Sequence, residues 1–239
     1  MLNTSDDGRT ATVTLPGGEL DEATARELTA TLGSLAEDRT VRVVALVASG
    51  TDFCTGAAAG LDPIAVDPDP ASALARIRVP VVAAISGACF DEGLEITLAA
   101  DIRVIGAGTT FRLGAATRGR LPVWGGSQRL ARAIRPAEAT AMMLLGSTLH
   151  ADRAASLGLA HEVAADPTAR ALELAEQLAG LGPLALEFAK EAVHRGAELP
   201  LRDGLRLEGD LNHQLAATDD RAEGLAAFFD KRPPDFSGR

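Results

Sequence analysis

Two glycine-containing turns carry the backbone groups best suited to chemistry in this chain. The first spans residues 53–57, directly after a β-branched apolar segment, and the second spans residues 86–95, running from an apolar segment into a helical one. Turns of small residues expose backbone N–H groups, and the first N–H groups of a helix lack intrahelical acceptors. Together they can hold one anionic oxygen. The local sequence leaves another interpretation open, in which both are ordinary strand-to-helix turns.

The elements that would position these turns alternate between strands and helices. A segment of alternating apolar and polar residues ends at a Pro-Gly-Gly turn. An amphipathic segment with acidic residues at its start follows. Three further segments are apolar throughout, which is typical of strands covered on both faces. Such alternation predicts an α/β core. The predicted strands are Thr10–Leu15, Val41–Ala48, Val79–Ile85 and Asp101–Ile105, and the first predicted helix is Asp21–Ala36.

The last third of the chain has a different pattern. After Pro167 it contains four successive amphipathic segments and no strand candidate, which predicts a helical appendage. We therefore predict an α/β core over residues 1–166 and a helical region over residues 167–239. The predicted helices are Thr168–Gly180, Pro183–Arg195, Leu199–Ala216 and Asp219–Phe229.

Composition excludes several classes of protein. The 23 Lys and Arg residues against 33 Asp and Glu give a net charge of −10, which argues against a general nucleic-acid binder. The longest apolar stretch, residues 79–90, is too short for a membrane helix. Two cysteines, Cys54 and Cys89, cannot build a disulfide framework. We expect a cytoplasmic protein that binds neither nucleic acid nor membrane.

Motifs for other chemistries are incomplete. His161-Glu162 resembles half of a zinc-protease helix, but the second ligand position holds Ala165. The segment Gly125-Gly126-Ser127-Gln128 lacks the spacing of a nucleophile elbow, and no phosphate-binding loop is present in the sequence. We therefore predict no metal site, and neither hydrolase nor NTPase chemistry has support.

Several motifs in order resemble the enoyl-CoA hydratase/isomerase (crotonase) family. The likeness spans nearly the whole chain, and the ordered set is more specific than any one motif. The segments that carry it are Val79–Gly87, Gly93–Arg103, Phe111, Gly119–Leu130, Ala151–Leu159 and Ala227–Arg232.

This resemblance implies a spiral of ββα turns with a C-terminal helical trimerisation region, acting on acyl-CoA thioesters. Coenzyme A would be part of the substrate, with no separate cofactor, and the assembly would be a homotrimer or a dimer of trimers. The family's shared chemistry is stabilisation of a thioester enolate, and alignment places the two oxyanion-hole N–H groups at Ala57 and Glu92. Loss of one such donor typically raises a barrier by about 2.7–4 kcal/mol.

The family's hydratases use two glutamates to activate water. The first position holds Glu95, but the second falls on Ala115, whose methyl group cannot exchange a proton. A second departure is Glu92, at a position where the family usually has glycine. Its carboxylate could replace the missing acid, repel the enolate, or turn to solvent. The neighbouring Asp91 is expected to cap the helix.

Lys231 matches the family's C-terminal lysine that reaches a phosphate of coenzyme A, across a subunit boundary. The commonly basic position before the first turn holds Thr51. Arg76 and Arg78 could compensate, but we favour a solvated pair of arginines. Three functions remain open. We favour an enoyl-CoA hydratase or isomerase using Glu95, and the alternatives are a non-catalytic acyl-CoA binding protein and a family decarboxylase or C–C lyase.

Overall fold

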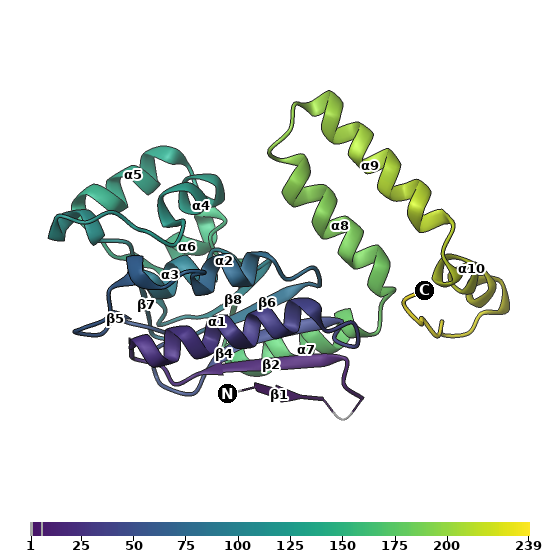
Figure 1. Ribbon diagram of the computed structural model, residues 1–239, viewed down its shortest axis with the longest axis horizontal. Helices are drawn as coiled ribbons and strands as arrows, with labels where there is room; N and C mark the ends of the chain where they lie inside the picture. Colours follow the sequence, from purple (N-terminus) through teal and green to yellow (C-terminus); the bar gives the residue numbers. More distant parts are fainter. Residues whose placement is uncertain (1, 6) are drawn as a thin grey trace.

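Three apolar segments, β4 (Val43–Ala48), β6 (Val81–Ile85) and β8 (Ile102–Gly106), form the centre of a six-stranded sheet. The computed structural model describes residues 2–5 and 7–239 (Figure 1). The strand order is β1-β2-β4-β6-β8-β11, and every neighbouring pair is parallel except β1 with β2. The outer strands are β1 (Leu2–Thr4), β2 (Thr10–Leu15) and β11 (Glu162–Ala164).

The predicted strands are present with small shifts at their ends. β2 has the predicted bounds, whereas β4 and β6 each begin two residues later than predicted. In β6 the cause is Pro80, which has no N–H to donate to the ladder, although its carbonyl accepts from the N–H of Val44.

Alternate residues of the central strands face two separate apolar layers. Val44 and Leu46 pack in the layer that includes helix α1 (Glu22–Glu37), and Val43 and Ala45 pack in the layer that includes helix α7 (Pro167–Ala179). Burial on both faces accounts for the nearly continuous apolar composition of these strands. The side chain of Asp21 caps α1 by accepting from the N–H of Thr24 at 2.8 Å.

Short strands and helices extend from the sheet to the two turns. A two-stranded sheet pairs β3 with β5, and a three-stranded sheet has the order β10-β9-β7. Their bounds are Glu19–Leu20 (β3), Gly56–Ala57 (β5), Ala88–Phe90 (β7), Thr110–Arg112 (β9) and Leu149–His150 (β10). The shorter helices are α2 (Pro70–Ala75), α3 (Glu92–Thr97), α4 (Gly126–Ala133), α5 (Pro136–Leu145) and α6 (Ala151–Leu157), and the 3-10 helices are η1 (Pro63–Ala65) and η2 (Ala115–Arg118).

The C-terminal helices extend away from the sheet (Figure 1), although Lys190 donates to the carbonyl of Val79, just before β6, at 2.9 Å. These are α8 (Pro183–Gly196), α9 (Leu201–Ala216) and α10 (Asp219–Asp230), whereas α7 packs on the sheet. The division of the chain at residue 166 stays a prediction. Among the helices of residues 2–5 and 7–239, none is long and apolar enough to cross a membrane.

A buried arginine supports the helix that carries the two glutamates. The guanidinium of Arg103 donates to the carbonyls of Leu159 (2.6 Å), Ala100 (2.7 Å) and Thr97 (3.3 Å), and the last of these ends α3. Arg103→Met would leave these carbonyls without that donor, so we expect the free energy of unfolding to fall by on the order of 3 kcal/mol in urea titrations. Arg132→Met, at an exposed arginine of α4, is the matched control. Equal effects of the two variants would refute this role.

Candidate active site

Helix α3 carries both glutamates singled out in the sequence. Glu92 is its first residue and Glu95 lies three positions later, so the two side chains share one side of the helix. Both side chains are buried, with Glu95 1% and Glu92 6% exposed. The fold therefore places two carboxyl groups together inside the protein.

Glu95 is held through one of its two carboxyl oxygens. Oε1 accepts from the N–H of Trp124 at 2.7 Å and of Gly126 at 2.8 Å. Within the described part of the chain no hydrogen bond is made to Oε2. Burial raises the pKa of Glu95 to about 7, against the two hydrogen bonds that lower it, and the charge of Glu92 raises it further. This carboxyl group can therefore take up or release a proton near neutral pH.

Glu92 points into the site and not to solvent. Its Oε2 accepts a hydrogen bond of 2.9 Å from the N–H of Ala57, the group that the sequence analysis assigns to the oxyanion hole. A carboxylate oxygen thus takes the hydrogen bond that the prediction gives to a substrate oxygen. The sequence gives no signal for this contact, because the two residues are 35 positions apart.

Small residues allow the two turns to meet. A Cβ atom at Gly93 would lie 2.5 Å from the Cβ of Cys54, so only glycine lets α3 approach the segment before β5 so closely. Cys54 and Cys89 form an isolated parallel bridge that ties the first turn to the second. Both thiols are free and buried, and burial raises the pKa of each, that of Cys54 to about 11.

Asp91 precedes α3 but does not cap it, so the expected capping role is wrong. Its backbone has φ 46°, and its side chain turns to another segment. Oδ1 accepts from the N–H of Gly114 and Oδ2 from Nη2 of Arg118, each at 2.8 Å. Nothing in the local sequence singles out Arg118, because its role depends on a partner 27 residues away.

Ala115, which the family resemblance predicts at the position of the second glutamate, begins η2 and is buried. The preceding residue, Gly114, is the one bound to Asp91, which brings Ala115 to the region beside α3. A buried methyl group therefore occupies this part of the structure, and a methyl group cannot exchange a proton. Among residues 2–5 and 7–239, no group of three or more His, Cys, Asp or Glu side chains is placed to hold a metal ion.

Two of the predicted cations, Lys231 and Arg78, lie away from α3. Lys231 is exposed at the C-terminal end of α10, on the opposite side of the molecule from α3 (Figure 1). Arg78 is not part of a solvated pair, because it is half-buried and binds Glu187 of α8 and the carbonyl of Asp38. Within this chain, Lys231 and the glutamates of α3 are therefore far apart.

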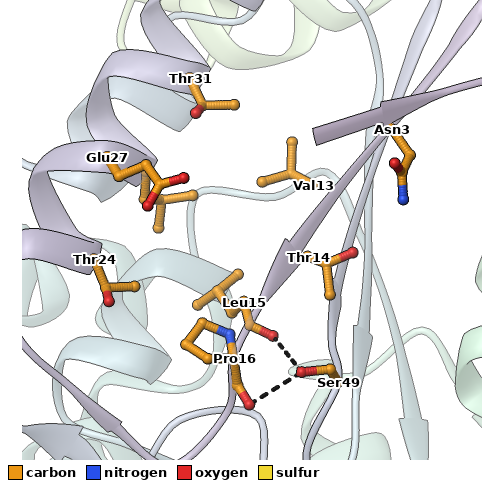
Figure 2. Close-up of a pocket in the computed structure, with 10 residues that line it drawn as sticks. Asn3, Val13, Thr14, Leu15, Pro16, Thr24, Glu27, Thr31 and Ser49 are labelled. Carbon is orange, nitrogen blue, oxygen red and sulfur yellow. Dashed lines mark hydrogen bonds between the residues drawn. The ribbon is translucent and has the colours of Figure 1, made fainter. Parts of the chain in front are cut away.

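Figure 2 shows a cavity of about 520 Å³ that does not belong to this site. It lies between α1 and β2 and is lined by residues such as Val13, Leu15, Thr24 and Glu27. The hydroxyl of Ser49 at its edge already binds backbone carbonyls. Among the described residues that line it, Glu27 alone is charged, and none comes from either glycine turn.

Comparison with known proteins identifies the family. The profile of enoyl-CoA hydratase/isomerase matches residues 18–239. The chain belongs to the enoyl-CoA hydratase/isomerase family. The 2,3-dehydroadipyl-CoA hydratase of Escherichia coli (strain K12) is 36% identical over 233 residues, which cover 92% of this chain and 90% of that protein.

Other relatives of the enoyl-CoA hydratase/isomerase family agree with the fold. The human enoyl-CoA hydratase domain-containing protein 2, mitochondrial, is 36% identical, with 89% of this chain and 79% of that protein covered. The crystal structure of enoyl-CoA hydratase from Bacillus anthracis matches with a TM-score of 0.91 at 30% identity, covering 100% of this chain and 99% of that chain. The predicted crotonase fold is thereby confirmed.

A glycine beside Glu95 offers a test of how the carboxyl group is held in this family member. A Cβ atom at Gly126 would lie 2.8 Å from Cγ and 3.0 Å from Oε1 of Glu95. In Gly126→Ala we therefore expect a displaced carboxyl group and a fall in turnover of at least about tenfold, measured as kcat. Gly108→Ala is the control, because a Cβ there meets no atom within 4 Å. Unchanged turnover in Gly126→Ala would show that the position of Glu95 is not critical.

Proposed function

We propose that this protein is an acyl-CoA thioester enzyme of the enoyl-CoA hydratase/isomerase type. The N–H groups of Ala57 and Glu92 stabilise the enolate oxygen, and Glu95 moves the proton. Two preorganised donors favour the charge that develops on the thioester oxygen. Glu92, whose carboxylate lies in the same site, is a second candidate acid.

The state of Glu95 carries this proposal. Its carboxyl group is buried, Oε1 is fixed by two backbone N–H groups, and burial raises its pKa to about 7. A purely structural carboxylate at a helix start would gain from ionisation near the helix dipole. A raised pKa and an oxygen without a donor are the properties of a proton-transfer group.

Ala115 and Glu92 favour a second candidate function, a non-catalytic acyl-CoA binding protein. With Ala115 the two-carboxylate mechanism lacks one proton-transfer group, and the Ala57 N–H is occupied by Glu92. A decarboxylase or C–C lyase of the same family is a further candidate, because one acid could suffice for those reactions. Weak or altered hydration is the expected outcome under the main proposal.

We also propose that the active assembly is a homotrimer or a dimer of trimers, in which Lys231 binds a phosphate of coenzyme A at a neighbouring site. The distance between α10 and α3 in Figure 1 supports a contribution between subunits. Helices α8–α10 and their connections also expose large apolar side chains, which partner subunits would cover. These are Val193, Leu199, Leu201, Leu205, Leu225, Phe228 and Phe229.

We also propose a cytoplasmic location, which the two free buried thiols, Cys54 and Cys89, support.

A panel of CoA thioesters followed by mass spectrometry tests the proposal. It includes crotonyl-CoA, 2,3-dehydroadipyl-CoA, malonyl-CoA and a 3-hydroxyacyl-CoA, and the second reflects the name of the Escherichia coli relative. A mass gain of one water on an enoyl-CoA supports hydration, and loss of carbon dioxide from malonyl-CoA supports decarboxylation. Binding without turnover of any member would favour the binding protein.

A further inference from the structure

The hydrogen bond from Ala57 to Glu92 has a consequence for substrate binding. The Glu92 carboxylate is 6% exposed and occupies the Ala57 N–H at 2.9 Å, so that donor is not free for a thioester. Within residues 2–5 and 7–239, no Lys, Arg or His forms an ion pair with this carboxylate. It faces the like charge of Glu95 instead.

We propose that Glu92 is a displaceable internal occupant of the oxyanion hole. Its carboxylate accepts the Ala57 hydrogen bond until a thioester carbonyl displaces it, and Glu92 thereby sets how strongly the site binds acyl thioesters. This inference rests on the proposed acyl-CoA function. It assigns Glu92 a role in thioester affinity and does not require Glu92 to transfer a proton.

The surroundings of Glu92 determine where its side chain is held. A Cβ atom at Gly56 would lie 3.4 Å from Oε2 of Glu92 and 3.7 Å from Oδ2 of Asp91, so both carboxylates border this glycine. The Asp91 oxygen is already bound to Arg118, whereas Glu92 Oε2 has a backbone donor only. A buried carboxylate with one hydrogen bond and no counter-ion is poorly compensated for its lost hydration, so moving it from the Ala57 N–H toward solvent costs little free energy.

Competition for one donor predicts a specific pattern of affinities. Butyryl-CoA has the thioester carbonyl and no reactive double bond, while free coenzyme A lacks the carbonyl. In Glu92→Gly and Glu92→Ala we expect butyryl-CoA to bind about tenfold more tightly than in the wild type, in isothermal titration calorimetry, because one hydrogen bond no longer has a competitor. The Kd of free coenzyme A should stay unchanged in both variants.

Glu22→Gly provides the matched control. Glu22 is likewise the first residue of a helix, but it lies on α1, is exposed and pairs with Arg26. Its removal should leave the Kd of butyryl-CoA unchanged. Acetoacetyl-CoA gives a second readout, because its β-keto thioester ionises to an enolate with its own near-ultraviolet absorption. The bound enolate fraction should rise in Glu92→Gly and Glu92→Ala.

The outcomes separate this inference from the proposed function. If the wild type and both Glu92 variants bind butyryl-CoA with the same Kd, the displacement role is wrong and the proposed function stands. If neither the wild type nor any variant binds butyryl-CoA or acetoacetyl-CoA, the proposed acyl-CoA function is wrong, and the inference is wrong with it. A crystal structure with butyryl-CoA in which Glu92 still accepts from the Ala57 N–H would also overturn the inference.

Discussion

Glu95→Gln is expected to lower turnover of the preferred enoyl-CoA by at least about 100-fold, because an amide cannot exchange the proton that the reaction moves. Glutamine keeps the size of the side chain, and its amide oxygen can still accept from the N–H groups of Trp124 and Gly126. The Kd of butyryl-CoA should therefore change little. Turnover equal to that of the wild type would remove Glu95 from the reaction.

The pH profile of the wild type tests the same role. In hydration Glu95 would take a proton from the attacking water, so its ionised form is the active one. Because its pKa is raised to about 7, the rate should increase as the pH rises through about 7. Glu95→Gln should lack this step in whatever activity remains. A wild-type rate that is independent of pH around 7 would contradict this assignment.

The raised pKa also has a consequence for stability. In the folded state Glu95 titrates at about 7, against 4.5 for an ordinary glutamate, so the folded protein holds a proton that the unfolded chain releases. Stability contributed by this group is therefore present below pH 4.5 and is lost as the pH rises toward 7. Above that pH, Glu95→Gln should be more stable than the wild type by on the order of 2–3 kcal/mol in urea titrations. If the difference in free energy of unfolding between Glu95→Gln and the wild type is the same below pH 4.5 and above pH 7, this effect is refuted.

Ala115→Glu is expected to raise the rate of enoyl-CoA hydration by at least about tenfold. A positioned general acid contributes about 10²–10⁴-fold, and part of this gain would be lost to strain, because Ala115 is buried. The measurement is the initial rate of crotonyl-CoA hydration. A gain from an undetectable wild-type rate would show that the native protein binds thioesters without efficient turnover.

Ala115→Gln is the control for this gain. It adds nearly the same volume as Ala115→Glu and cannot exchange a proton. If both variants have the same hydration rate, Ala115 does not occupy the place of the missing acid. Circular dichroism melts of both variants would establish that each is folded before the rates are compared.

The central strands and the main helices could be predicted from the sequence because each has a strong local pattern. β2 has the bounds that alternation predicted, and α1 begins after Asp21, which caps it. The strands β5 and β7 have only two and three residues, which is too short for a periodic pattern. They form because tertiary contacts bring partner strands to them.

The motifs also determined the family, and the resemblance singled out Glu95, Ala115 and Glu92 as candidate site residues. The order of glycines and apolar segments along the chain reflects places where two backbone segments approach closely, such as Gly93 against Cys54. These approaches depend on residue size, and residue size can be read from the sequence. Family membership therefore follows from the chain alone.

Only the tertiary structure decided where the acidic side chains point. The sequence left three possibilities open for the Glu92 carboxylate. The fold directs it to the N–H of Ala57, 35 residues away. Asp91 turns from its own helix to Gly114 and Arg118 for the same reason. The orientation of a buried carboxylate depends on which donors distant segments bring within about 3 Å, and local sequence does not contain that information.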